Sequence, residues 1–365
     1  MAHDPTTKMT RRAFQTSMAA LPAAAAAGGS PQQQEQQQRP SAKPIRIVTM
    51  YRFEPFEIEK IKKAASAAEV EIIICHSRDE LHRNMREADV VYGNINGPDL
   101  DYAPRLKWVQ AGSAGVEWMD DQMRQSPVVL TNYARIFAPG ISETAIGLLL
   151  SLTRGLAKYY IPQFAQHQMK PVGTVKSDHH TELVGRTMAI VGMGGMGSAI
   201  AHRAYYGFDM KIIATDAKPM AAPHCVSELH DPSWFHTMVP IADVLVGAAP
   251  STPHTRRMFN EQVFRSMKKS AYFLAMSRGD LYDDLALAKA LKEGWIAGAG
   301  LDVTPQEPLP SDHPLFDCPN VVMSAHTSGW SPDRQVRLID FFAENVRRYS
   351  EGIPLLNVVD KPKGY

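Results

Sequence analysis

Short apolar runs rich in β-branched residues alternate with segments of helical spacing along most of the chain. The segment IRIVTM at 45–50 is typical of a strand, and FEIEKIKKAASAA at 56–68 repeats its apolar residues at the spacing of a helix. Such alternation predicts βαβ units and a parallel sheet covered on both faces. Five strands are predicted in this first part: IRIVTM (45–50), VEIIIC (70–75), ADVVYGN (88–94), LKWVQA (106–111) and VVLTN (128–132).

A long helix and a second alternation follow. Residues 142–160 have helical spacing, and Ser142 is placed to cap the N-terminus of that helix. Residues 331–349 are again helical in pattern. Between these helices six strands are predicted, which matches a doubly wound dinucleotide-binding sheet. They are TMAIVGM (187–193), MKIIATD (210–216), DVLVGAA (243–249), AYFLAMS (271–277), IAGAGLDV (296–303) and VVMSAH (321–326).

The N-terminal segment has a different composition. A basic region with Arg11 and Arg12 precedes an alanine-rich run at 19–27 that offers Ala-x-Ala sequences to a peptidase. The paired arginines, with Phe14 after them, resemble a twin-arginine export signal, a route that carries folded proteins. Residues 1–43 are therefore predicted to be a signal peptide and a Gln- and Pro-rich linker, and the protein to be periplasmic. If the arginines are incidental, the protein is cytoplasmic with a disordered tail.

The charge balance and the cysteines exclude several classes of function. The 365 residues include 39 basic and 38 acidic side chains, a formal net charge of +1, which gives no electrostatic reason for a nucleic-acid or membrane-surface partner. No apolar run reaches the roughly 20 residues of a membrane span. Cys75, Cys225 and Cys318 are far apart, so neither a disulfide framework nor a metal site is expected.

The glycine loop after the first strand of the second alternation is typical of dinucleotide binding. Gly192 permits a tight turn, Gly194 allows close approach of a pyrophosphate, and Gly197 allows a helix to pack against the strand. The next strand ends at Asp216, about twenty residues on, where a carboxylate can bind the ribose hydroxyls. Because that charge repels a 2′-phosphate, the pattern favours NAD over NADP. A glycine-rich turn without a ligand is the alternative.

Three later segments carry a resemblance to a known family. They are 248–291, built around an arginine–glycine pair, 297–316, with its aspartate–valine and glutamate–proline pairs, and 321–330, with a histidine. In this order, behind the glycine loop, they resemble the D-isomer-specific 2-hydroxyacid dehydrogenase family. The resemblance implies an α/β fold with two Rossmann-like domains, doubly wound parallel sheets and an active site in the interdomain cleft. The expected domains are a flavodoxin-like substrate domain (44–141 with 331–365) and an NAD-binding domain (142–330).

The resemblance also implies a catalytic set of Arg278, Glu307 and His326. A histidine titrates near neutral pH, so His326 can give a proton to the oxygen of a reduced carbonyl and take it back in the reverse direction. Glu307 would bond the other ring nitrogen and orient the ring. Arg278 remains charged at any relevant pH and can bind the substrate carboxylate and polarise the reacting carbonyl.

Further binding roles follow from the same resemblance. Asp302 is expected near the nicotinamide carboxamide. In the glycine loop itself, and apart from the resemblance, the side chains of Met193 and Met196 are expected to pack rather than to coordinate anything. The expected cofactor-binding residues are Gly192, Gly194, Gly195, Met196, Gly197, Asp216, Pro250, Met276 and Asp302. In VQAGSAGVEWMD (109–120), a Gly-rich turn can expose backbone amides to an anion. The expected substrate-binding residues there are Ala114, Gly115 and Val116.

The sequence departs from the family pattern at a few positions. Asn132 and Glu143 keep the family's spacing, and Asn94 or Asn96 in YGNING either touches substrate or belongs to a plain turn. The departures are Ala275 in place of the usual asparagine, Glu117 in place of aspartate, Arg135 where glycine is common and Ser142 in place of alanine.

The implied reaction is NAD-linked hydride transfer between a D-2-hydroxy acid and its 2-oxo acid, and a homodimer is expected from the family. Two alternatives remain open. One is a non-catalytic NAD-binding protein like the family's corepressors, against which the export signal and the neutral charge count. The other is phosphite oxidation, which uses the same three residues. Glu307 argues against a formate dehydrogenase, which has glutamine there.

Overall fold

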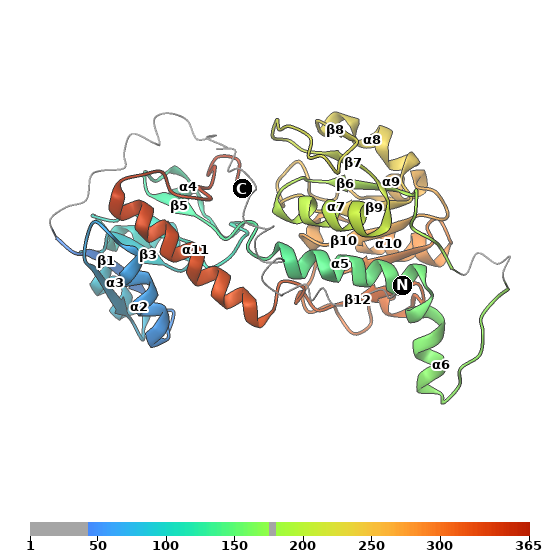
Figure 1. The fold of residues 1–365 in the computed structure, drawn as a ribbon, viewed down its shortest axis with the longest axis horizontal. Helices are drawn as coiled ribbons and strands as arrows, with labels where there is room; N and C mark the ends of the chain where they lie inside the picture. Colours follow the sequence, from blue (N-terminus) through green and yellow to red (C-terminus); the bar gives the residue numbers. More distant parts are fainter. Residues whose placement is uncertain (1–42, 175–179) are drawn as a thin grey trace, which may run out of the picture. The chain divides into compact units, whose positions relative to one another are not determined.

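The computed structural model describes residues 43–174 and 180–365, so residues 1–42 of the predicted signal and linker lie outside the described residues. The first five predicted strands are present and form one parallel sheet in the order β2-β1-β3-β4-β5. Figure 1 labels three of them, β1, β3 and β5, in the same part of the molecule. Their bounds are β1 Ile45–Thr49, β2 Val70–Ile74, β3 Val90–Tyr92, β4 Trp108–Gln110 and β5 Val129–Thr131. The helices between them are α2 Pro55–Ala64, α3 Arg78–Met85, the 3-10 helix η1 Gly97–Tyr102 and α4 Asp121–Gln125.

The last helix of the chain, α11 (Pro332–Glu351), covers the first sheet together with α2. Ser331 caps it by accepting a hydrogen bond from the amide of Arg334 at 3.1 Å. Its C-cap is Gly352, whose φ of 68° is the left-handed conformation that favours glycine. Phe342 on its buried face contacts the ring of Trp108. The two ends of the described chain therefore build one layer.

The C-terminal tail is fastened to the same sheet. Val358 forms an antiparallel bridge with Thr131 at the end of β5. Lys361 is buried, and its ammonium donates to the carbonyl oxygens of Met123, Ser126 and Val128. Burial lowers the pKa of Lys361 to about 8. The carbonyls replace the water that the ammonium loses, and the tail is held in place.

A second parallel sheet has seven strands, in the order β12-β11-β10-β9-β6-β7-β8. All six predicted strands are present: β6 Thr187–Val191, β7 Lys211–Thr215, β9 Val244–Gly247, β10 Tyr272–Ala275, β11 Gly298–Leu301 and β12 Val321–Met323. The edge strand β8 (Glu228–His230) was not predicted. The helices are α5 Ala138–Thr153, α6 Ile161–Ala165, α7 Gly195–Phe208, α8 Phe235–Met238, α9 Glu261–Ser266 and α10 Asp284–Lys292. An α/β fold with two parallel sheets is thus confirmed.

The start of helix α5 differs from the prediction. The helix begins at Ala138, and Ser142 lies inside it, so the prediction that Ser142 is its N-cap is wrong. The Ser142 hydroxyl instead donates to the carbonyl oxygens of Ala138 and Pro139, at 2.6 and 2.9 Å. Proline lacks an amide hydrogen but fits the first helical turn, where that hydrogen has no helical partner, and the helix therefore extends through the Pro-Gly pair.

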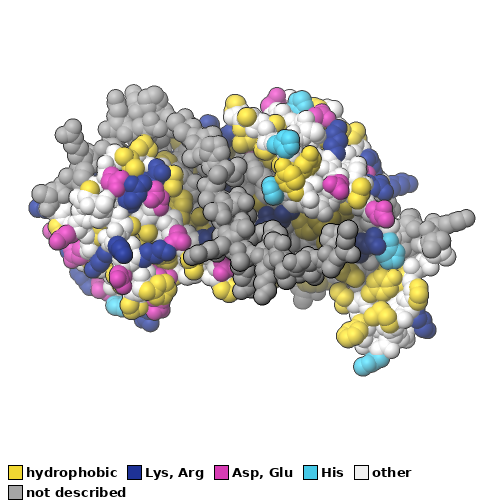
Figure 2. Space-filling view, in the orientation of Figure 1, with side chains coloured by type: hydrophobic (Ala, Val, Ile, Leu, Met, Phe, Trp, Pro, Cys, Tyr) yellow, Lys and Arg dark blue, Asp and Glu magenta, His cyan; other side chains and the backbone are white. Residues whose placement is uncertain are grey.

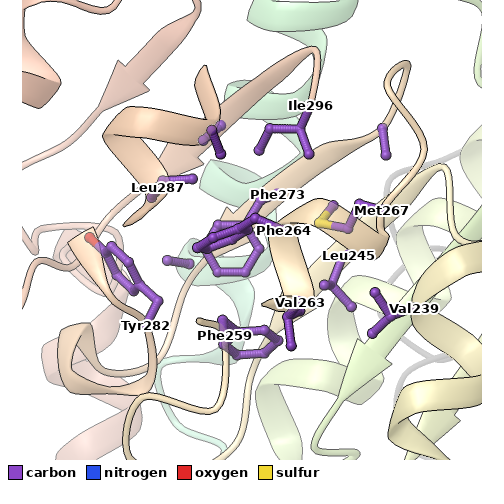
Figure 3. Packing of buried hydrophobic residues seen from close by; sticks show 14 of the residues in the cluster. Val239, Leu245, Phe259, Val263, Phe264, Met267, Phe273, Tyr282, Leu287 and Ile296 are labelled. Carbon is purple, nitrogen blue, oxygen red and sulfur yellow. The ribbon is translucent and has the colours of Figure 1, made fainter. Parts of the chain in front are cut away.

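An aromatic core supports the second sheet beside β10 and β11 (Figure 3). The ring centroid of Phe273 in β10 lies 5.0 Å from that of Phe259, 5.3 Å from that of Phe264 and 5.7 Å from that of Tyr282. The Tyr282 hydroxyl donates to the carbonyl oxygen of Val303 at 2.9 Å, and burial raises the pKa of this phenol. The core thereby joins the segments that follow β10 and β11.

In residues 43–174 and 180–365, no helix is both long and apolar enough to cross a membrane.

Candidate active site

The candidate residues of the second sheet follow the carboxyl ends of its strands. Arg278 comes three residues after β10, Asp302 directly after β11 and His326 three residues after β12, and these three strands are neighbours. Met276 directly follows β10 and Pro250 lies beyond β9. The carboxyl ends of parallel strands meet at one edge, where such sheets bind ligands. The fold therefore brings the predicted residues to a single edge.

His326 and Glu307 form a hydrogen-bonded pair. The Nδ1 atom of His326 lies 2.7 Å from Oε2 of Glu307, and both side chains are open to solvent, with exposed fractions of 46% and 40%. The other oxygen of Glu307 accepts from the amide of Thr304 at 3.1 Å, which fixes the carboxylate. An ionised carboxylate only accepts, so Nδ1 carries the proton and Nε2 is the nitrogen available to a substrate.

Asp302 holds the turn that carries His326. Its buried carboxylate accepts from the Ser324 hydroxyl at 2.8 Å, from the amides of Thr327 and Ser328 at 3.2 Å each, and from the Ser328 hydroxyl. Its carbonyl oxygen accepts from the amide of His326 at 2.8 Å. These bonds hold His326 at a φ of 54°, an uncommon conformation for a side chain with a Cβ. The structure thus places Asp302 beneath the histidine turn.

Arg278 is paired with Glu117, a residue of the segment after β4. The Nε atom of Arg278 donates to Oε1 of Glu117 at 2.8 Å and Nη2 donates to Oε2 at 3.5 Å. Nη1 donates to the carbonyl oxygen of Ser277 at 2.7 Å. Glu117, which follows β4 of the first sheet, therefore holds the guanidinium of Arg278, which follows β10 of the second sheet.

The predicted carboxylate-binding turn lies against this ion pair. A Cβ added at Gly115 would collide with Nη2 of Arg278 and with the Glu117 carboxylate. Only glycine lets the backbone approach so closely. Ala114 and Gly115 are partly exposed, whereas the Val116 side chain is buried in the core beside the first sheet, so that only the backbone of Val116 can face a ligand.

Two asparagines support the turn at residues 112–116. Asn94 accepts from the amide of Gly112 at 3.0 Å, and Asn132 donates to the carbonyl oxygen of Ala114 at 2.6 Å. Asn94 thus has a structural partner in the turn. Glu143 lies elsewhere, on α5, and pairs with Arg203 of α7 at 3.2 Å.

The glycine loop has the geometry that a dinucleotide requires. Gly192 has a φ of 95°, and a Cβ there would lie 2.8 Å from the backbone of Ala248. A Cβ at Gly197 would collide with the carbonyl oxygen of Gly192, whereas a Cβ at Gly194 would meet nothing within 4 Å. Helix α7 begins at Gly195 and directs its first amides at this open side. The loop is tight at Gly192 and Gly197 and open at Gly194.

Asp216 closes the same loop from the end of β7. Its Oδ2 accepts from the amide of Met193 at 2.6 Å, and Oδ1 accepts from the amide of Lys218 at 2.7 Å. The side chain of Met193 is fully buried and that of Met196 packs on the same core, as predicted for both. The carboxylate therefore lies beside the glycine loop.

Arg135, where glycine is common in the family, has a φ of 76°. The backbone thus keeps a conformation that suits glycine although the residue is arginine. A Cβ at Gly195 would collide with the side chain of Arg135, so the absence of a side chain at 195 makes room for it. Sequence reasoning assigned a role neither to this contact nor to the pair of Glu117 with Arg278.

No group of three or more His, Cys, Asp or Glu side chains suited to a metal ion occurs in the described part of the chain.

Comparison with known proteins matches this arrangement. A family model described as "D-isomer specific 2-hydroxyacid dehydrogenase, NAD binding domain" matches residues 146–328. The chain is 33% identical to a glyoxylate reductase of Thermofilum pendens over 275 residues, which are 74% of this chain and 80% of that protein.

Solved structures show the same similarity. The crystal structure of a D-isomer specific 2-hydroxyacid dehydrogenase family protein of Aeromonas salmonicida is 28% identical, with a TM-score of 0.71, and the match covers 88% of this chain and 100% of that one. An NADPH-dependent glyoxylate/hydroxypyruvate reductase of Sinorhizobium meliloti, in complex with NADP and sulfate, is 25% identical with a TM-score of 0.71, covering 88% and 99%.

Proposed function

Because the chain belongs to the D-isomer specific 2-hydroxyacid dehydrogenase family, we propose that it reduces small 2-oxo acids to D-2-hydroxy acids with NADH, and reverses the reaction with NAD. The observation that carries the proposal is the His326–Glu307 pair at 2.7 Å, at the sheet edge that also holds Arg278. The open glycine loop fits a dinucleotide, which when bound supplies or accepts the hydride.

The chain's own residues supply the proton and hold the substrate. Arg278 binds the carboxylate and polarises the carbonyl, which makes the carbonyl carbon a better hydride acceptor. As that carbon gains the hydride, the electron pair of the carbonyl bond moves to the oxygen, and Nε2 of His326 gives the oxygen its proton. Glu307 holds the ring and stabilises the imidazolium before the proton leaves.

A screen of 2-oxo acids tests the proposal. We expect the purified protein to oxidise NADH, followed by absorbance, with at least one of glyoxylate, hydroxypyruvate, pyruvate or a longer 2-oxo acid. The relatives point first to glyoxylate, since the protein of Thermofilum pendens is named a glyoxylate reductase. NADH binding without oxidation by any of these acids would contradict an enzymatic role and favour a regulatory one.

We expect NADH to be preferred over NADPH because Asp216 places a negative charge beside the glycine loop, where a 2′-phosphate would be repelled. Asp216→Asn removes the charge and keeps one acceptor for the Met193 amide. The ratio of kcat/KM for NADH to that for NADPH should fall about tenfold or more, the effect of one unfavourable charge contact. The relative from Sinorhizobium meliloti is NADPH-dependent, so both cofactors must be measured.

Asp209→Asn provides the matched control, because Asp209 caps the opposite end of α7 and asparagine tolerates its left-handed conformation. An unchanged cofactor ratio in the Asp216 variant, or a wild type that prefers NADPH, would refute the assignment to NAD.

A homodimer is part of the proposal, and an exposed apolar face supports it. The exposed apolar residues are Ile161 and Phe164 of α6 and the nearby Met169. The exposed fraction of Phe164 is 74%. Figure 2 shows hydrophobic side chains gathered over α6. Contiguous exposed apolar surface is typical of an interface. Sedimentation equilibrium should give twice the chain mass, whereas a monomer at micromolar concentration would contradict the proposal.

Export by the twin-arginine route is proposed from the paired arginines of the leader. Soluble NAD is not expected to be abundant outside the cytoplasm, so the cofactor would travel bound and be recycled by a second substrate. The double variant Arg11→Lys with Arg12→Lys should keep the protein in the cytoplasmic fraction of a bacterial host. Equal export of wild type and variant would refute the route, and exported protein lacking NAD would refute cofactor transport.

A further inference from the structure

The ion pair of Glu117 and Arg278 joins residues 161 positions apart in the sequence. Glu117 follows the Gly-rich turn after β4, and Arg278 follows β10. The exposed fraction is 39% for the Glu117 side chain and 30% for that of Arg278, so solvent and small ligands can reach the ion pair. Glu117 therefore lies against the residue that would bind the substrate carboxylate.

The hydrogen bonds leave one edge of the guanidinium free for a ligand. An arginine has five N–H donors in a fixed plane. Glu117 takes the N–H of Nε and one N–H of Nη2, and the Ser277 carbonyl takes one N–H of Nη1. One N–H on each of Nη1 and Nη2 remains, and the backbone of Gly115 packs against Nη2. These two N–H groups are parallel when the Ser277 carbonyl takes the N–H of Nη1 on the Cδ side. That is the fork that binds a carboxylate through both oxygens.

The charges of the four groups around this fork sum to zero when His326 is protonated. Glu117 and Glu307 contribute two negative charges, and Arg278 and a protonated His326 contribute two positive charges. A substrate with a single carboxylate adds one negative charge beside Arg278. A second anionic group on a small substrate would add a further negative charge near the Glu117 carboxylate, and like charges repel.

We propose that Glu117 is a positioning and specificity-determining residue, which directs the outer edge of Arg278 to the substrate and selects 2-oxo acids with one negative charge over those with two. The inference rests on the proposed function, since it assigns Arg278 to the substrate carboxylate. Glu117 has two separable effects: its charge excludes a second anion, and its length lets it reach Nε of Arg278.

Two ligands of almost equal size separate the effect of charge from that of shape. Oxamate carries one negative charge and oxalate carries two, and both resemble a small 2-oxo acid. Their dissociation constants for the protein–NADH complex are measured by calorimetry, so the readout does not depend on turnover. We expect the wild type to bind oxamate about tenfold or more tighter than oxalate, the effect of one repulsive charge contact.

Glu117→Gln removes the charge and leaves an amide oxygen that can still accept from Arg278. In this variant the preference for oxamate should fall about tenfold, mainly through tighter binding of oxalate. Glu117→Asp keeps the charge and shortens the side chain by one methylene. With this variant the preference for oxamate should persist, while both ligands bind more weakly because the guanidinium is no longer held.

Glu261→Gln is the matched control. Glu261 pairs with Arg265 on α9 at 2.8 Å, so the variant also loses a glutamate–arginine pair, away from the site. Its oxamate preference should equal that of the wild type.

Three outcomes would overturn the inference. An unchanged oxamate preference in Glu117→Gln would show that the charge does not select. Tighter binding of both ligands in that variant would show that Glu117 merely competes for Arg278. Equal binding of oxamate and oxalate by the wild type would show that the site does not select by charge. A wild type that turns over no 2-oxo acid but still prefers oxamate to oxalate would instead contradict the proposed reaction alone.

Discussion

Turnover of the 2-oxo acid should fall by about 10²–10⁴-fold when His326 is replaced by alanine, the range expected for loss of a general acid. The alanine variant has no group that can deliver the proton to the carbonyl oxygen from the position of Nε2. The turn itself should persist, because Asp302 holds it mainly through the backbone and hydroxyls of its neighbours. The expected pattern is a fall in kcat with nearly unchanged binding of NADH.

The measurement combines steady-state rates with NADH binding followed by fluorescence. His236→Ala is the control, because His236 is exposed on α8 and its ring contacts only Phe235 among the described aromatic pairs. The turnover of Glu307→Gln should lie between those of His326→Ala and His236→Ala. The amide can still hold the ring, but it lacks the charge that stabilises the imidazolium. Turnover at the wild-type level in the alanine variant would exclude His326 as the acid.

Arg278→Lys should lower kcat/KM by about 10²–10³-fold although the positive charge remains, a loss comparable to removal of one preorganised donor. Lysine cannot offer two parallel N–H groups to a carboxylate, and it cannot bond Glu117 and Ser277 at the same time. The loss should appear in both KM and kcat, because the same side chain binds the carboxylate and polarises the carbonyl.

Arg256→Lys serves as the comparison, because Arg256 is an exposed residue whose partner, Asp280, lies 3.5 Å away. The NADH dissociation constant should be the same in both variants and the wild type. A normal KM for the 2-oxo acid in Arg278→Lys would contradict carboxylate binding by Arg278.

Most strands were predictable because parallel strands between helices are apolar on both faces. The exception, β8, has two polar residues among its three and lies at the sheet edge, so it gives no such signal. The start of α5 was placed too late, since Pro139 and Gly140 suggest a break although proline suits a first turn. Local pattern therefore locates buried strands better than edges and helix starts.

The candidate residues were predictable as types and positions, but their partners were not. Pairing of His326 with Glu307 followed from the family resemblance, and the structure places the two 2.7 Å apart. The contact between Glu117 and Arg278 depends on how segments after β4 and β10 meet, which no local pattern encodes. Asp302 was expected at the cofactor, and the four hydrogen bonds that its carboxylate accepts are seen only once the turn at 324–328 is folded.

The covering of the first sheet by α11 and the tail limits how early the layer of that sheet can be completed during synthesis. Strands β1 to β5 emerge from the ribosome first, yet their layer stays incomplete until residues 332–365 have emerged, because α11 packs on α2 and Lys361 bonds the carbonyls around α4. The second sheet, which ends at Met323, can be complete earlier, the reverse of the usual order in which the N-terminal part folds first. Export of an unfolded, unfinished chain would separate β1 to β5 from α11, whereas the proposed twin-arginine route exports a protein that has already folded. On this proposal the N-terminal signal, although synthesised first, acts only after the C-terminal helix has packed.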